Sequence, residues 1–273
     1  MGDCLITRRS GGGGGLKLAD WATGSDEEIV AMIALADAGT INLSDFWSVG
    51  QTRSVNLSAI SDGWETTQSA AKGESQKAQT VEFVLMDSEC KGFTITATGK
   101  KPSFIVGMKS CMRNTGFMNV VRNKSCNWSN CSRRYWCNNI FYNAVPDTLR
   151  PIFKQFTWAQ GVGGTAATSN TVTTQDYFAI PPVKAVLGEQ KISFAGEANL
   201  YDIWEWYKTT SNRNKEAVDE TFYNKTAYWL GSPYRNNSGF SELSGGFLRM
   251  SDGEFNQYYY ENTTYGISPF GCI

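Results

Sequence analysis

The side chains best suited to contact another molecule lie between Tyr234 and Tyr260, where aromatic, amide and charged residues follow no clear apolar–polar pattern. Tyrosine offers a large amphipathic contact area and loses only two rotors on binding, while asparagine offers adaptable hydrogen bonds. This composition predicts a surface for contact recognition. The predicted ligand-binding residues are Tyr234, Arg235, Asn236, Asn237, Phe240, Glu242, Arg249, Glu254, Asn256, Gln257, Tyr258, Tyr259 and Tyr260.

Three consecutive rings, Tyr258, Tyr259 and Tyr260, sit in this segment. On a strand, Tyr258 and Tyr260 would share one face and Tyr259 would point to the other. The alternative interpretation is an ordinary surface strand that places one ring in the core.

Catalytic chemistry is restricted because the 273 residues include no histidine. This excludes histidine-activated serine and cysteine nucleophiles and histidine-ligated zinc. The net charge is −1, from 25 basic and 26 acidic residues. A near-neutral chain lacks the basic footprint of a protein that binds nucleic acid or an anionic membrane. We therefore expect a protein that is not an enzyme, with no cofactor, no bound metal, no nucleic-acid partner and no membrane partner.

Three weaker features leave alternatives open. Glu197, Asp202 and Glu205 include the two carboxylates that a glycoside hydrolase needs, although their context singles out none of them. Asp252-Gly253-Glu254 has oxygen ligands for Ca²⁺ but is more typical of a solvated turn. Trp204 and Trp206 flank Glu205 at a spacing that suits sugar stacking, and core packing is the better interpretation.

The seven cysteines are an odd number without a CxxC pair, which argues against a complete disulfide framework. Cys126, Cys131 and Cys137 are close together in the chain, yet no histidine is present to complete a mixed metal site. We expect free, mostly buried thiols.

A helix is predicted after Ser25, because Ser25-Asp26-Glu27-Glu28 has the form of a capping box. Ile29, Met32, Ile33 and Ala36 would form its apolar face, and Gly39 is the expected stop. Further along, the sequence predicts strands at 54–60 and 79–86, with 79–86 half-buried. It also predicts helices at 133–141, capped by Asn130 or Ser132, and at 148–156, and a short strand at 177–180.

The chain from Trp229 onward is rich in aromatic residues, Gly, Ser and Asn and contains no lysine. Its pattern predicts short strands at 247–250, 258–260 and 267–272. Helices first and strands last indicate an α+β fold. Gly11–Gly15 is a glycine run, interpreted either as a linker or as a hinge or packed axis. We expect residues 1–20 to be a flexible attachment segment and residues 21–273 to be one domain.

Several segments, taken in order, resemble a large family of uncharacterised domains from gut bacteria and their phages, over about residues 40–273. The matching segments are Trp47-Ser48-Val49-Gly50-Gln51-Thr52-Arg53, Thr80 to Asp87, Gly107-Met108-Lys109, Trp128 to Phe141, Thr173-Thr174-Gln175-Asp176-Tyr177-Phe178, Tyr228 to Pro233, and Gly266 to Ile273. Gly231 and Ser268 depart from the pattern, because many relatives have arginine at both positions.

The resemblance implies an α+β, C-type-lectin-like fold, similar to the formylglycine-generating-enzyme fold, with short strands and a few helices. It is also similar to the variable proteins of diversity-generating retroelements, in which a rigid scaffold carries hypervariable residues. About residues 229–273 would then form the variable region. No reactive cysteine pair of the formylglycine-generating enzymes can be placed here, so no catalytic residue is carried over.

The expected function is that of a phage tail-tip or receptor-binding protein, an adhesin that binds a bacterial cell-surface protein or glycan. The N-terminal segment would attach to other phage tail proteins, and the family implies a homo-oligomer, a trimer. We see no signal peptide, and Ile29–Ala36 is too short an apolar run to span a bilayer, so we expect synthesis in the host cytoplasm and assembly into the virion. The alternatives are a bacterial or prophage structural module without a variable site, and a glycan hydrolase.

Overall fold

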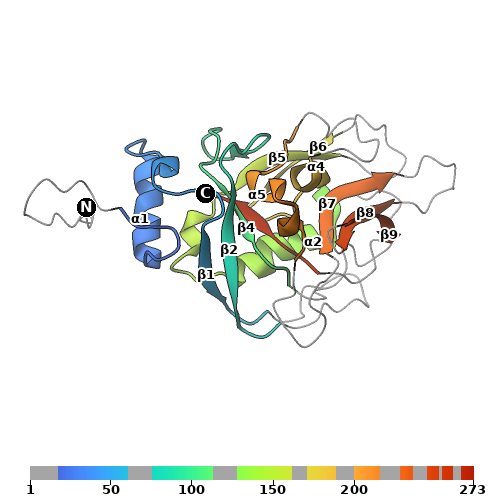
Figure 1. The fold of residues 1–273 in the computed structure, drawn as a ribbon, viewed down its shortest axis with the longest axis horizontal. Helices are drawn as coiled ribbons and strands as arrows, with labels where there is room; N and C mark the ends of the chain where they lie inside the picture. The colour runs from blue at the N-terminus through green and yellow to red at the C-terminus, as the bar shows by residue number, and fades with distance from the viewer. Residues whose placement is uncertain are drawn as a thin grey trace, which may run out of the picture.

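The computed structural model describes residues 18–60, 76–112, 128–161, 171–188, 200–215, 228–235, 245–251, 254–260 and 266–273. These residues form antiparallel sheets and short helices around an aromatic core, so the described fold mixes helix and sheet (Figure 1). Strands begin early in the chain, with β1 (Thr52–Leu57) directly after the first helical segments. The expected separation into an early helical part and a late stranded part is therefore wrong.

The first sheet has the strand order β1-β2-β4-β10. Its other strands are β2 (Gln79–Asp87), β4 (Ile105–Met108) and β10 (Phe270–Cys272). The predicted strand at 79–86 is confirmed. It is not half-buried, however, because every residue from Phe83 to Met86 is buried. A strand covered on both faces reads as a continuous apolar run rather than an alternation.

Two further sheets have three strands each. One contains β3 (Thr94–Ile95), β5 (Phe156–Gly161) and β6 (Thr171–Asp176). The other contains β7 (Tyr228–Arg235), β8 (Gly245–Ser251) and β9 (Glu254–Tyr260). The predicted strands at 247–250 and 258–260 are confirmed within β8 and β9.

Strand β10 joins the first two sheets. Besides its pairing with β4, it makes single β-bridges from Cys272 to Lys154 and from Phe270 to Ala179. The ring of Phe270 packs between Phe93 and Trp204, with ring centroids 5.6 and 4.9 Å away. Residues 266–273 are all buried, so this last strand is a central part of the core.

The first helix, α1 (Asp26–Asp37), confirms the predicted capping box. The Ser25 hydroxyl accepts from the Glu28 amide at 3.3 Å, and the Glu28 carboxylate accepts from the Ser25 amide at 2.8 Å. Ile29 is buried on the apolar face, and Gly39 ends the helix with a positive φ of 74°. Glycine reaches this left-handed conformation without a steric penalty, which explains the stop at that position.

The middle helix differs from the prediction in its cap and in its type. Cys131 is the N-cap, and its Sγ accepts from the Arg134 amide at 3.4 Å. Helix α2 (Ser132–Tyr135) continues into a π-helical segment, Trp136–Phe141, and then into α3 (Tyr142–Ala144). π-helical turns are rare and occur often at functional sites.

Two predictions from the middle of the chain are wrong. In place of a helix at 148–156 there is a single 3₁₀ turn, Arg150–Ile152, because Phe156 begins β5. In place of a strand at 177–180, β6 ends at Asp176 and Ala179 makes only its bridge to β10. The remaining described helices are 3₁₀ turns at Leu43–Asp45, Trp128–Asn130 and Thr210–Arg213, with α4 (Val183–Leu187) and α5 (Glu205–Lys208).

Helix α1 lies at one end of the long axis of the molecule, and β8 and β9 lie at the other (Figure 1). Residues just before α1 contact the core, since the Ala19 carbonyl accepts from the Trp47 indole at 2.9 Å. None of the described helices has the length and apolar character that a membrane crossing requires.

Candidate functional site

The predicted ligand-binding residues fall largely on the sheet β7-β8-β9. Tyr234 and Arg235 end β7 and Arg249 is in β8. Strand β9 contains Glu254, Asn256, Gln257, Tyr258, Tyr259 and Tyr260. Four predicted residues lie outside the described part of the chain, namely Asn236, Asn237, Phe240 and Glu242. The backbone therefore gathers residues from three consecutive strands into one small sheet.

The strand register brings particular positions of this sheet together. Tyr234 pairs with Gly246, which pairs in turn with Tyr260. Arg249 pairs with Asn256 on one side and with Trp229 on the other. Both pairings contain a register shift. Such irregularities change the twist and direction of strands, and they occur often beside binding sites.

The first half of β7 fastens this sheet to the rest of the protein. The Gly231 amide donates to the Pro181 carbonyl at 2.9 Å, and the Ser232 hydroxyl accepts from the Val183 amide at 3.0 Å. The Tyr228 hydroxyl donates to the Arg213 carbonyl at 2.8 Å. Tyr228, Gly231 and Ser232 are all buried, so β7 is connected to the rest of the protein in the interior.

Gly231 and Ser268 both have structural roles. A Cβ on Gly231 would overlap the carbonyl oxygen of Ile180, so any larger residue requires the backbone to move. The buried Ser268 hydroxyl lies 3.1 Å from the carbonyls of both Met108 and Ser110. Gly231 therefore provides a close approach of two backbone segments, and Ser268 provides a small buried hydroxyl.

A buried lysine lies under the start of β7. Lys215 is 1% exposed, and its ammonium group donates to the carbonyls of Met108 and Lys109. The rings of Tyr207 and Tyr228 have their centroids 5.5 and 5.8 Å from Nζ. Burial lowers the pKa of Lys215 to about 7, and the neighbouring Cys111 opposes that shift in part. Desolvation disfavours the charged form of a lysine.

Asp176 is completely buried at the end of β6, and its carboxylate accepts hydrogen bonds from several segments. One carboxylate oxygen accepts from the indoles of Trp128 and Trp158, at 2.9 and 2.7 Å, and from the Thr174 hydroxyl at 2.7 Å. The other oxygen accepts from Arg134 Nε at 2.7 Å and from the Asn138 amide at 2.9 Å. These five donors occupy the carboxylate, so it is a structural anchor for its surroundings.

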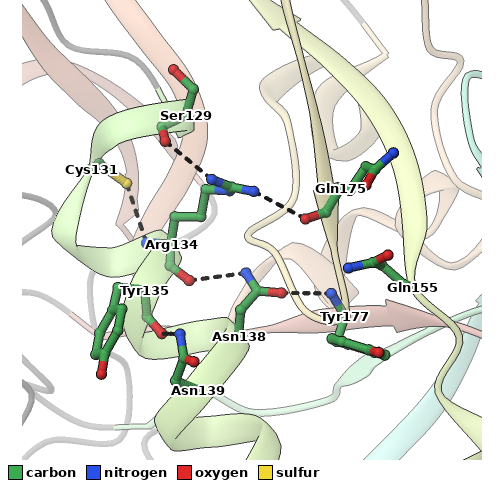
Figure 2. A pocket seen from close by; sticks show the side chains of 9 residues that line it. All are labelled: Ser129, Cys131, Arg134, Tyr135, Asn138, Asn139, Gln155, Gln175 and Tyr177. Carbon is green, nitrogen blue, oxygen red and sulfur yellow. Dashed lines mark hydrogen bonds between the residues drawn. The ribbon is translucent and has the colours of Figure 1, made fainter. Parts of the chain in front are cut away.

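Asn138 extends this network to the backbone. Its amide nitrogen also donates to the carbonyls of Arg134 and Phe178, and its oxygen accepts from the Tyr177 amide at 2.6 Å (Figure 2). The π-helical segment is thereby joined to the chain that leaves β6. We call the group of Asp176, Arg134, Asn138, Trp128 and Trp158 the Asp176 network.

A polar cavity of about 460 Å³ opens beside this network (Figure 2). Its walls come from the α2 and π-helical segment on one side, and from Gln155, Gln175 and Tyr177 on the other. The sequence prediction did not include this cavity. The available signal was the group of Asn, Gln and Tyr residues in the lining segments. These segments lie far apart in the sequence, and only the folded chain brings them together.

The alternative catalytic carboxylates do not form a described site. Asp202 is exposed and paired with Lys91 at 2.9 Å, and Glu205 is paired with Lys208 on the surface of α5. Glu197 and the Asp252-Gly253 part of the possible calcium loop lie outside the described residues. Among the described residues no cluster of three metal-binding side chains is found.

Cysteine and tryptophan expectations agree with the structure where it describes them. Cys90, Cys111, Cys131, Cys137 and Cys272 are buried thiols outside any disulfide, and Cys4 and Cys126 lie outside the described residues. Burial raises the pKa of the Cys111 and Cys131 thiols to about 12. Such thiols are poor nucleophiles. Trp204 is buried in the core, as predicted.

Comparisons with protein family models, with curated proteins and with solved structures find no match to this chain. The function must therefore be argued from the residues and their geometry.

Proposed function

We propose that this chain is a non-enzymatic adhesin of a phage tail, which binds a bacterial surface protein or glycan through the sheet β7-β8-β9. The observation that carries the proposal is the strand register, because it aligns Tyr234, Gly246 and Tyr260 across three strands. A surface assembled in this way presents aromatic and amide residues over several adjacent strands, as a binding surface requires.

The position of this sheet supports the proposal. It lies at the end of the molecule opposite α1, and residues 18–20 enter the fold next to α1 (Figure 1). An N-terminal attachment to other tail proteins would then leave β8 and β9 at the distal end. On this proposal the fold is C-type-lectin-like and the assembly is a trimer, in which several copies raise the avidity for a receptor.

The way the sheet is fastened also supports the proposal. Gly231 and Ser232 hold β7 to the scaffold through backbone contacts and a small hydroxyl, and both lie before the predicted ligand-binding residues. Substitutions between Tyr234 and Tyr260 would leave those contacts in place. A scaffold that carries changeable residues needs this separation between anchoring and binding.

The test is a binding assay with the purified full chain on intact host cells. We expect replacement of Tyr258, Tyr259 and Tyr260 by alanine to abolish adsorption and to keep the circular dichroism spectrum of the parent. Phe46→Ala is the matched control, because Phe46 is also an aromatic residue and its side chain is 42% exposed. It follows the 3₁₀ turn Leu43–Asp45, which contacts α1.

Adsorption by the folded triple variant at the level of the parent would contradict the proposal. Gene sequences from sister isolates provide a second test. Changes concentrated at codons between 234 and 260 support an adhesin with a diversified surface. Uniform drift along the gene would instead support the structural module without a variable site.

A further inference from the structure

We infer that the cavity beside the Asp176 network is a second binding site, for an uncharged, hydroxyl-rich ligand of the saccharide class. The site is separate from the predicted residues of the sheet β7-β8-β9, so the inference goes beyond the proposed function. Its volume of about 460 Å³ lies within the ordinary range for small-molecule sites.

Charge selects against ionic ligands. Among the described residues that line the cavity, Arg134 is the one with a charged side chain. Its Nε is paired with the buried Asp176, and its other two nitrogens donate to the carbonyls of Ser129 and Gln175, at 3.2 and 3.0 Å. The positive charge is therefore compensated inside the protein. An anion would find no uncompensated cation here, and a cation would find no carboxylate on the described lining.

The lining also selects against apolar ligands. No aliphatic side chain is among the described lining residues, which are amides, tyrosines, a serine, a cysteine and the paired arginine. Peptide side chains and acyl chains gain affinity by burying apolar surface, and these walls offer little of it. Amide and hydroxyl groups both donate and accept hydrogen bonds, so they match a ligand that carries many hydroxyl groups.

Available hydrogen-bonding groups remain on both sides of the cavity. The Asn138 side-chain amide has protein partners for both its nitrogen and its oxygen. The Gln155 side chain makes no hydrogen bond to another described residue, and Figure 2 shows its amide directed toward the helical wall of the cavity. Tyr135, 51% exposed, lies at the start of the π-helical segment. Tyr177 stacks on Tyr142, with centroids 4.4 Å apart, which holds its ring in place.

The fixed frame makes this arrangement a prepared site rather than a surface hollow. Asn138 joins the helical wall to the backbone of Tyr177 and Phe178 on the opposite wall. The distance between the walls is thus set by protein–protein hydrogen bonds before any ligand arrives. A preorganised site loses less free energy in ordering its side chains on binding.

The experiment measures binding of three neutral trisaccharides, maltotriose, cellotriose and chitotriose, to the full chain by calorimetry and ligand-observed NMR. Trigalacturonic acid and a short neutral peptide serve as anionic and peptide probes. We expect at least one neutral trisaccharide to bind and neither other probe to compete. Gln155→Ala and Tyr135→Ala should each weaken binding about fivefold, the effect of losing one hydrogen bond or one ring contact.

Gln79→Ala is the matched control, because Gln79 begins β2 and does not line the cavity. We expect it to bind like the parent, and all variants to keep the parent melting temperature. The inference is overturned if no neutral trisaccharide binds, if Gln155→Ala binds as tightly as Gln79→Ala, or if either other probe binds more tightly than the sugars.

The triple variant of Tyr258, Tyr259 and Tyr260 separates this inference from the proposed function. We expect it to lose adsorption to cells and to keep saccharide binding at the cavity. If the triple variant loses saccharide binding while Gln155→Ala retains it, the sugar site belongs to the sheet. That result would overturn the cavity assignment and leave the adhesin proposal intact.

Discussion

The Asp176 network and the sheet β7-β8-β9 contain similar residue types, and on the proposed function they use them in opposite ways. In the network, one carboxylate receives five donors from segments on β5, β6 and the middle helix. In the sheet, the strands pair with shifted register, and backbone and hydroxyl groups in the first part of β7 bond to the scaffold. On the proposed function, polar residues define the fold in the Asp176 network and are available for contact in the sheet.

This difference predicts how the two regions respond to substitution. A buried group with several partners cannot change without leaving those partners unsatisfied, which costs free energy for each of them. On the proposed function, a residue between Tyr234 and Tyr260 serves the ligand, so its replacement should cost the fold much less. The following substitutions test that contrast.

Asp176→Asn should have the largest effect. It removes the counter-charge of Arg134 and turns an amide N–H₂ toward groups that are themselves donors. Breaking a buried ion pair on one side lowers the free energy of unfolding by about 3–5 kcal/mol. Urea unfolding monitored by tryptophan fluorescence measures the change. The exposed Asp202→Asn is the control, and a loss no larger than for that variant would contradict the structural role of Asp176.

Gly231→Ala should come next, with a loss of about 1–3 kcal/mol, because the added Cβ would overlap the Ile180 carbonyl. Thermal unfolding measures it. Ser232→Ala is the neighbouring control and removes the acceptor for the Val183 amide without adding atoms. Equal stability of Gly231→Ala and the parent would show that β7 is not held closely against α4 and its preceding segment.

Lys215→Met should change the pH dependence of stability. The folded chain loses the Lys215 proton near pH 7, while the unfolded chain keeps it to the ordinary lysine range. Between those values the unfolded state binds more protons, so the free energy of unfolding of the parent rises with pH. The free energy of unfolding of the parent, relative to that of Lys215→Met, should therefore increase by about 1–2 kcal/mol between pH 7 and pH 9.

Chemical unfolding at several pH values measures this difference. Cys111, Tyr207 and Tyr228 face Lys215, and burial raises the pKa of all three, so they stay neutral over this range. A difference that does not vary with pH would show that Lys215 remains protonated throughout.

On the proposed function, the smallest effect is expected for Gln257→Ala in β9, below about 0.5 kcal/mol, because a residue that serves the ligand contributes little to stability. Gln160→Ala is the matched substitution in the scaffold, where Gln160 is buried and donates to Thr174 at 3.1 Å. Urea unfolding of both variants gives the comparison directly. If the two losses were equal, the contrast between the regions would not hold.

Local signals in the sequence were sufficient for local structure. The capping box at Ser25, the stop at Gly39 and strands β8 and β9 depend on neighbouring residues and were predicted correctly. The helix expected at 148–156 was wrong because Phe156 is recruited into β5 by pairing with β6, a contact that no local pattern contains.

The Asp176 network was missed for the same reason. Asp176 is one carboxylate in a polar strand, and its donors Trp128 and Arg134 lie more than forty residues away in sequence. Thr174, two residues earlier on the same strand face, was the one local hint. The π-helical segment also left no trace in the apolar pattern, because a single wide turn changes the period too little to detect.

The place of β10 imposes an order on how the protein assembles. A nascent chain that has reached β9 already contains every other strand, yet Phe93, Phe156 and Trp204 still lack the ring that packs among them. The sheet of β1, β2 and β4 and the segments beside β5 and β6 are joined only when Phe270–Cys272 has been synthesised and pairs with both. Chains interrupted shortly before that point would expose aromatic surface and be prone to aggregate, so a complete core requires synthesis to continue past the sheet β7-β8-β9.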